Sequence, residues 1–285
     1  MTEAKLAQNE GQNEAIWLEV ALDAARAAGE LAKKGWRKHP VSTHKGRIDL
    51  VTQFDLDSEK LLRERLGLRT RFAVVGEEGG GERAKEAGGL TWYVDPIDGT
   101  TNFVHGHPFW CVSVGLFAGS TPVVGVVVAP SLGVEWLGIA GLHATRNGEV
   151  CTVSTVDSFR ESLLATGFPY DRHVSEDNNF DAFVAIKKQC QAVRRCGSAA
   201  IDMCFVADGT YDGYWEKKVK PWDVAAGSAI VLAAGGKVTD YEGKPSDLAN
   251  GQMVATNGRI HGSLIAELNA IGERGLALTP DPKED

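Results

Sequence analysis

The spacing of apolar residues near the start of the chain predicts a long helix. Ile16, Val20 and Ala24 recur every four positions within residues 13–36, which places them on one face of a helix. Apolar and charged residues follow the same period over residues 56–66. We therefore expect a helix in each of these two segments.

Short apolar runs then predict a series of strands. They are rich in valine and aromatic residues, and turn-forming residues separate them. The expected strands cover residues 72–75, 92–94, 111–117, 122–129, 134–140 and 150–153. Gly119-Ser120 and Asn147-Gly148 are typical of turns that join neighbouring strands. This part of the chain is therefore expected to be rich in sheet.

After residue 153 the pattern changes to an alternation of strands and helices. The expected strands cover residues 163–166, 211–215, 237–239 and 253–255, and the expected helices 178–191, 198–207, 224–234 and 264–271. Periodicity alone indicates only a mixed α and β protein. We divide the chain into a flexible tail (residues 1–14), an N-terminal α+β half (15–153) and a C-terminal α/β half (154–285).

Composition narrows the class of protein. Of the 285 residues, 43% are hydrophobic and 24% are charged, so the chain is neither disordered nor membrane-like. No apolar run approaches the roughly 20 residues of a membrane span, and residues 1–14 lack the basic and apolar regions of a secretory signal. The five cysteines are scattered without a CxxC pair, which favours reduced thiols and a cytoplasmic location.

The formal net charge of −8 argues against nucleic-acid binding, because a phosphate backbone requires clustered Lys and Arg. It is compatible with a phosphate substrate, since bound metal ions reverse the local charge of an acidic site. Lys45 and the basic residues within 217–220 are exceptions to the acidic surface.

Four acidic residues stand at the ends of predicted elements. Asp95 and Asp98 follow the strand at residues 92–94, Glu77 follows an earlier strand, and Asp223 opens a helix. Each alone has an ordinary explanation as a turn former, loop acid or helix cap. Together they predict one cleft for divalent metal ions, because carboxylate oxygens are the ligands that Mg²⁺ prefers.

A glycine follows the second aspartate directly. Gly99 lets the backbone approach a ligand closely, and the amides of Gly99, Thr100 and Thr101 would point at an anion if a helix or turn begins there. The same segment is therefore expected to hold a phosphate beside the metal ions.

Four motifs resemble those of a known family. Residues 76–78 (GEE), 95–103 (DPIDGTTNF) and 222–227 (WDVAAG) resemble the signatures of the inositol monophosphatase family, and residues 49–55 (DLVTQFD) resemble a further motif. Order and spacing also match, over nearly the whole chain. The segments most similar to bacterial inositol-1-monophosphatases are residues 165–171 (ATGFPYD), 194–200 (RRCGSAA) and 213–216 (GYWE).

The resemblance implies a fold and a metal site. The fold is a layered αβαβα sandwich of the mixed α/β class. Glu77, Asp95 and the main-chain carbonyl of Ile97 would hold one Mg²⁺, and Asp95, Asp98 and Asp223 a second, with two or three ions per site. Most ligands then lie in the N-terminal half, whereas Asp223 and the substrate rim lie in the C-terminal half. Inhibition by lithium and a homodimer are further expectations from the family.

The catalytic chemistry follows in part from the residues themselves. No Cys or Ser stands in a recognisable nucleophile elbow, so the chain favours direct attack of metal-activated water on phosphorus. The resemblance implies that Asp55 and Thr100 orient and deprotonate that water, with Glu77 sharing the task. The substrate contacts that it implies are Ile97, Asp98, Gly99, Thr100, Gly197, Ser198, Ala199, Glu216 and Asp223.

The expected reaction is hydrolysis of inositol monophosphate to inositol and phosphate. Histidinol phosphate, fructose 1,6-bisphosphate and 3′-phosphoadenosine 5′-phosphate are alternative substrates for this fold, and a binding role in an RNA-polymerase-associated complex is an alternative of another class. Glu216 has a competing explanation as a surface ion pair with the neighbouring lysines. Residues 79–89 are either a mobile flap or a surface insertion.

Overall fold

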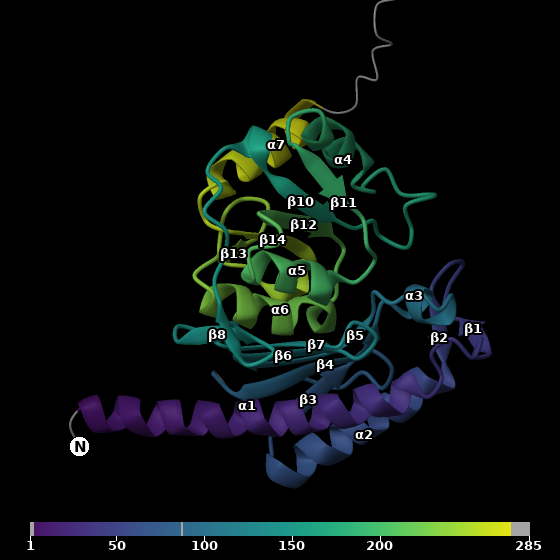
Figure 1. Cartoon of the computed structure of the whole chain (residues 1–285), viewed down its shortest axis with the longest axis vertical. Helices are drawn as coiled ribbons and strands as arrows, with labels where there is room; N and C mark the ends of the chain where they lie inside the picture. The colour runs from purple at the N-terminus through teal and green to yellow at the C-terminus, as the bar shows by residue number, and fades with distance from the viewer. Residues whose placement is uncertain (1–2, 87, 275–285) are drawn as a thin grey trace, which may run out of the picture.

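The computed structural model describes residues 3–86 and 88–274, which form five layers (Figure 1). Two helices cover a seven-stranded sheet, two more separate it from a five-stranded sheet, and a last pair covers the far face. The αβαβα sandwich and the mixed α/β class are confirmed. Within the described residues, no helix combines the length and the apolar character that crossing a membrane requires.

The first layer consists of α1 (Glu3–Lys33) and α2 (Gln53–Arg69). Both pack on the same face of the seven-stranded sheet, where alanines of α1 meet valines and Trp92 of the strands. Alanine suits this contact because it lets a helix lie close to a sheet without losing side-chain entropy. The two helices that the apolar spacing predicts are confirmed.

The seven-stranded sheet has the order β3-β4-β5-β6-β7-β8-β9. Its strands are β3 (Ala73–Gly76), β4 (Leu90–Asp98), β5 (Cys111–Ala118), β6 (Thr121–Ala129), β7 (Val134–Ile139), β8 (His143–Arg146) and β9 (Glu149–Cys151). Neighbours run antiparallel except β3 and β4, which run parallel. The predicted turns at Gly119-Ser120 and Asn147-Gly148 join β5 to β6 and β8 to β9.

The middle layer contains α5 (Ala199–Ala207) and α6 (Pro221–Ala233). Three glycines, Gly115, Gly125 and Gly138, stand opposite one another on adjacent strands of the first sheet. A Cβ on any of them would come within 3.0 Å of the backbone of α6 at Ala226 or Ile230. This glycine column therefore lets α6 rest directly on the sheet.

The five-stranded sheet has the order β11-β10-β12-β14-β13. Its strands are β10 (Leu163–Thr166), β11 (Ala192–Arg194), β12 (Gly213–Lys217), β13 (Lys237–Thr239) and β14 (Gln252–Thr256). The last layer, α4 (Phe180–Lys187) and α7 (His261–Arg274), packs its apolar side chains against Leu164, Trp215 and Val254. Two short 3-10 helices, η1 (Phe159–Glu161) and η2 (Leu248–Asn250), complete this half.

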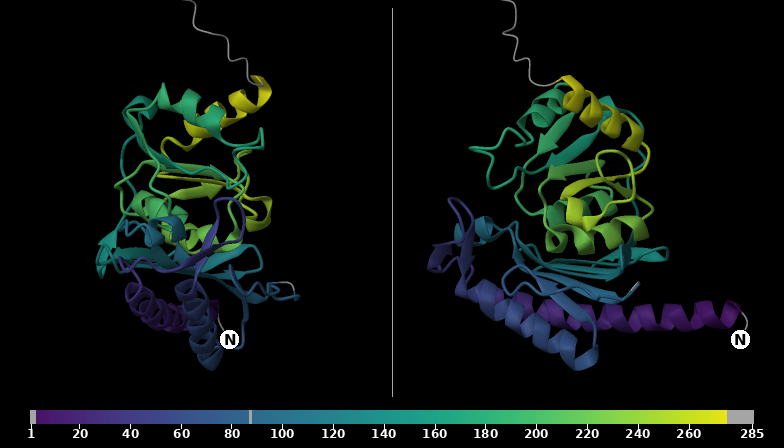
Figure 2. Two further views of the ribbon diagram at one scale, coloured as in Figure 1. Left: turned by 90° about the vertical axis from the view of Figure 1, so that its right-hand side faces the viewer. Right: turned by 180° about the vertical axis from the view of Figure 1, so that it is seen from behind.

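Some local expectations were wrong. The first helix begins at Glu3, so residues 3–14, expected to be a flexible tail, continue α1 and project beyond the sheet (Figure 2). Our expectation rested on the polar and acidic character of this stretch. Its Ala, Leu, Lys, Glu and Gln residues favour helix. The short pair β1 (Ser42–His44) and β2 (Leu50–Thr52) has no apolar run and was not predicted. The division into two halves at residue 153 stays a prediction.

Candidate active site

A cavity of about 730 Å³ opens where the ends of the two sheets meet. It receives residues from the ends of β3, β4, β10 and β12 and from the starts of α3 (Thr100–Val104), α5 and α6. The predicted site residues that line it are Glu77, Asp95, Ile97, Asp98, Gly99, Thr100, Gly197, Ala199, Glu216 and Asp223. Asp55 and Ser198 do not line it; they are buried and bond to residues that do.

The end of β4 places Asp95 and Asp98 in the cavity wall. The pairing of β4 with β5 is interrupted between these two residues, which frees the backbone to turn. The Ile97 amide donates to Asp95 Oδ1 (3.0 Å) and fixes that carboxylate. Gly99 follows with φ of 95°, a conformation that favours glycine, and α3 begins at the next residue.

Asp98 is held by the start of α5. The Ser198 hydroxyl and the Ala200 amide each donate to Asp98 Oδ2 at 2.7 Å. Ser198 is the N-cap of α5 and only 1% exposed. Its hydroxyl thus orients a carboxylate of the other half of the chain, rather than facing the cavity as a substrate contact would.

Asp223 reaches the same cavity from the third position of α6. Pro221 opens this helix, where its missing N–H is no loss. The Lys220 amide donates to Asp223 Oδ2 at 2.8 Å. The carboxylate is therefore held at the helix N-terminus, where a negative charge is favoured.

Glu77 lies in a loop whose backbone is held by the buried carboxylate of Glu59. Glu59 of α2 accepts hydrogen bonds from the amides of Glu78 (2.6 Å) and Gly79 (2.8 Å). Lys45 bridges Glu77 (2.8 Å) and Glu78 (2.5 Å). Burial opposes the charged form of Lys45, but the two glutamates outweigh that effect and raise its pKa. No sequence motif indicates this role of Glu59, which depends on the packing of α2 against the loop.

Burial opposes the ionised form of all four acids and raises their pKa values. Burial, together with Glu77, Asp98 and Asp223, holds the pKa of Asp95 well above its usual range. Burial likewise raises the pKa of Asp98 to about 6 and the pKa values of Asp223 and Glu77. Such a cluster gains from cations that neutralise it.

The donor set fits a hard divalent cation. All of its members are carboxylate or carbonyl oxygens, as Mg²⁺ prefers. Within the described part of the chain, however, no three His, Cys, Asp or Glu side chains already surround a common point closely enough for a metal ion. Lys45 takes part of the charge of Glu77 in this arrangement. To hold an ion, these side chains must therefore rotate. An ion that uses Glu77 as a ligand also requires that Glu77 separate from Lys45.

Asp55 and Thr100 form the contact that the family motif implies. Thr100 Oγ1 lies 3.1 Å from Asp55 Oδ1 and 3.0 Å from the Ile97 carbonyl oxygen. The Thr52 amide (2.8 Å) and hydroxyl (2.6 Å) donate to the other oxygen of Asp55. Burial raises the pKa of Asp55 to about 6 despite these bonds. This pair can therefore take up a proton near neutral pH.

Comparison with known proteins agrees with this geometry. The sequence model of the inositol monophosphatase family matches residues 13–273. The chain belongs to this family. An inositol-1-monophosphatase of Synechocystis is 43% identical over 255 residues, which cover 89% of each protein. The family is one of metal-dependent phosphatases.

Two other relatives bear on function. An inositol monophosphatase structure from Anabaena superposes with a TM-score of 0.82 at 39% identity, over 90% of this chain and 97% of that one. A protein of Pseudomonas aeruginosa named Nus factor SuhB is 36% identical over 88% of this chain and 95% of its own length.

In this member of the inositol monophosphatase family, the second sheet supplies the opposite wall. The Tyr214 hydroxyl donates to Glu216 Oε2 at 2.6 Å, and burial raises the pKa of Glu216 to about 7. A side chain at Gly167 would overlap the Glu216 carboxylate. The neighbouring lysines bind elsewhere, Lys217 to Asp177 and Lys218 to Asp171. Glu216 is thus part of the cavity and not a surface ion pair.

Some residues that line the cavity are not among the predicted site residues. Arg195 lines the cavity, whereas its neighbour Arg194 does not. Tyr170, from the family-like segment at residues 165–171, also lines it, and so does Asp202, for which no motif indicated a role. Residues 79–86 and 88–89 do not line it, so the structure gives no support to a flap over the site.

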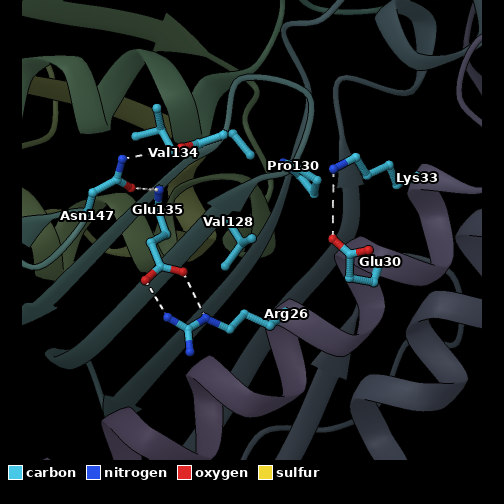
Figure 3. Close-up of a pocket in the computed structure, with 10 residues that line it drawn as sticks. Arg26, Glu30, Lys33, Val128, Pro130, Val134, Glu135 and Asn147 are labelled. Carbon is cyan, nitrogen blue, oxygen red and sulfur yellow. Dashed lines mark hydrogen bonds and ion pairs between the residues drawn. The ribbon is translucent and has the colours of Figure 1, made fainter.

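A second, smaller cavity of about 440 Å³ lies between α1 and the β6–β7 turn. Figure 3 shows Arg26 in contact with Glu135, at 2.9 and 2.6 Å, and Lys33 beside Glu30. The Glu135 amide donates to Asn147 Oδ1. None of the predicted site residues lines this groove, and we assign the chemistry to the larger cavity.

Proposed function

We propose that this chain hydrolyses inositol monophosphate to inositol and phosphate with Mg²⁺. The observation that carries the proposal is the convergence of Glu77, Asp95, Asp98 and Asp223, from three separate segments, on one cavity. The Synechocystis relative, named as an inositol-1-monophosphatase, supports the substrate. The metal ions and their number remain part of the proposal.

Glu77, Asp95 and the Ile97 carbonyl would hold one ion, and Asp95, Asp98 and Asp223 another. Bound Mg²⁺ lowers the pKa of a water molecule and neutralises charge on the phosphate. The protein contributes fixed positions for these ligands: Ser198 and the Ala200 amide hold Asp98, and the Lys220 amide holds Asp223.

Thr100 and Asp55 would move the proton. The Thr100 hydroxyl has one hydrogen and two acceptors, Asp55 and the Ile97 carbonyl oxygen. When the carbonyl oxygen is engaged as a ligand, the hydroxyl donates to Asp55 and turns its lone pairs toward the attacking water. Proton transfer then runs from the water through Thr100 to Asp55.

The substrate would lie between the two walls. The backbone amides of Gly99 and Thr100, at the turn before α3, would bind phosphate oxygens. Gly197, Ala199 and Glu216 would contact the alcohol. Ser198, which we expected among these contacts, acts on the substrate only through Asp98 in this proposal.

Phosphate release with Mg²⁺ tests the proposal. Purified protein is offered inositol 1-phosphate, histidinol phosphate, fructose 1,6-bisphosphate and 3′-phosphoadenosine 5′-phosphate, with EDTA as control. Preference for inositol 1-phosphate that EDTA abolishes supports both substrate and metal. Preference for another ester keeps the chemistry and replaces the substrate, and no release from any of them contradicts the enzyme function.

A binding role is a second candidate, because the Pseudomonas aeruginosa relative carries the name of a Nus factor. Its partner would be an RNA-polymerase-associated complex. Asp95→Asn separates the two functions: a folded variant that loses hydrolysis but still complements a deletion strain supports binding. Loss of complementation together with activity removes that support.

Assembly and location complete the proposal. We expect a homodimer in the cytoplasm, with inhibition by lithium. Light scattering of the purified protein measures its mass against the 30.6 kDa of one chain, and a monomer at micromolar concentration would contradict the dimer. Insensitivity of phosphate release to high lithium would contradict the expected geometry of the second metal position.

A further inference from the structure

Asp202 is a buried acid of the cavity for which the reaction described above has no use. It lies on α5, one turn after Ala199, and both residues line the cavity. Only 2% of its surface is exposed. Its neighbours on this helix are apolar, which makes a carboxylate at this position exceptional.

Asp202 has no hydrogen-bond partner among the described residues. Its Oδ1 is completely buried and unpaired. Asp202 is nevertheless among the residues that line the cavity. A buried polar group without a partner destabilises a fold, so an aspartate at this position is costly.

The surroundings of Asp202 do not compensate for that cost. Glu216 on β12 and Asp98 on β4 are the nearest charges that oppose its ionisation, and with burial they hold the pKa of Asp202 well above its usual range. Arg195 lies near enough to favour the carboxylate but forms no ion pair with it. A carboxyl kept here at a cost is typical of a functional position.

We propose that Asp202 is a specificity-determining residue that forms a hydrogen bond with a hydroxyl group on the alcohol half of the phosphate ester. This inference rests on the proposed phosphatase function. Asp202 and Glu216 both line the cavity, as does Ala199, which the proposed function places beside the alcohol. Two carboxyl groups that face one polyol distinguish it from an ester without hydroxyl groups.

Asp202→Leu tests the proposal, because leucine has nearly the shape of aspartate and no polar atom. We compare kcat/KM for inositol 1-phosphate with kcat/KM for p-nitrophenyl phosphate, whose leaving group offers no hydroxyl before cleavage. We expect a fall of about 10- to 100-fold for the first and less than about threefold for the second. Asp202→Asn keeps a hydrogen-bonding group and should restore most of the loss.

Thermal stability separates this role from a structural one. Asp202→Leu should leave Tm unchanged or raise it, because it removes an unpaired buried group. Asp208→Leu, at the C-cap of the same helix, is the matched control. The Asp208 side chain is also 2% exposed, but it is partnered by Trp136 Nε1 at 2.9 Å and Arg146 at 3.3 Å. Its replacement should lower Tm and leave the ratio between substrates unchanged.

The outcomes are distinct. If wild-type protein releases no phosphate from inositol 1-phosphate, the proposed function fails, and the ratio is taken with whichever hydroxylated ester of the panel is hydrolysed. If wild type is active but Asp202→Leu keeps the wild-type ratio, the inference fails and the function stands. A lower Tm with equal losses for both substrates would also overturn the inference and make Asp202 structural.

Discussion

The larger cavity and the groove beside α1 are both lined by charged side chains, yet they balance charge in opposite ways. In the groove beside α1, Glu135 has Arg26 and Glu30 has Lys33. In the larger cavity, burial raises the pKa values of four acids, neighbouring acids add to this effect for Asp95 and Asp223, and Lys45 pairs with only Glu77 among the four. Charges that serve stability are paired within the protein, whereas unpaired buried acids mark a place for cations from solution.

Of the substitutions that test this contrast, Asp95→Asn should change activity most. Asp95 is the acid shared by both proposed ions, and its loss should reduce kcat/KM for inositol 1-phosphate by about 1000-fold or more. The folded protein without metal should become more stable, since one of the mutually repelling carboxyls is gone. Steady-state kinetics and Tm in EDTA measure both effects; near wild-type activity would refute the two-ion assignment.

Ser198→Ala should have the next largest effect. It removes the 2.7 Å bond to Asp98 and leaves that carboxylate free to turn, so kcat/KM should fall about 10- to 100-fold and more Mg²⁺ should be needed. Ser228→Ala is the control, because Ser228 is equally buried but bonds only to the Val224 carbonyl of its own helix. Equal effects of the two substitutions would show that Ser198 does not act through Asp98.

Stability without metal should depend on pH. Burial raises the pKa of Asp55 and Asp98 to about 6 and of Glu216 to about 7, so the folded state binds these protons more tightly than the unfolded chain does. Their contribution to stability is complete below the unfolded pKa of about 4 and is lost as pH rises through 6 and 7. Tm in EDTA should fall from pH 5 to pH 8.

Magnesium supplies the control for that measurement. Added Mg²⁺ should restore Tm above pH 7, where the carboxylates are ionised and bind it best. A Tm in EDTA that does not change between pH 5 and pH 8 would show that the cluster is not strained.

A substitution in the groove beside α1 should have the smallest effect on stability and activity. Glu135→Gln breaks the ion pair with Arg26, whose side chain is 56% exposed, so stability should fall by no more than about 1 kcal/mol. Activity toward inositol 1-phosphate should stay within about twofold of wild type. Chemical denaturation and the phosphate assay measure the two quantities. A large loss of activity would mean that the groove contributes to function after all.

The fold was predictable where apolar runs are long. Strands such as β5 and β6 and the helix α6 follow from continuous apolar runs that are almost wholly buried, and α2 follows from buried positions at helical spacing. The pair β1–β2 and the strand β11 (Ala192–Arg194) are three residues each and owe their form to neighbours. The layered arrangement came from the resemblance to the family, not from the pattern.

The acids of the site were predictable because strand and helix ends carry them in short motifs. Asp95 and Asp98 needed only the strand before them, and Asp223 only the helix after it. Ser198 and Glu59 act through bonds that span 100 and about 20 positions, which no local pattern contains. Asp202 stands within an apolar helix, and its isolation became visible only once β12 and β4 surrounded it.

The glycine column of the first sheet sets the distance between α6 and that sheet, at a place far from any reacting atom. Gly115, Gly125 and Gly138 set how deeply α6 settles, and the first turn of α6 carries Asp223 toward the acids of β4. The absence of a side chain at these three positions therefore sets the width of the cleft. A library that randomises only cavity residues leaves this width unchanged, and a single Gly125→Ala substitution would reset it without altering one ligand.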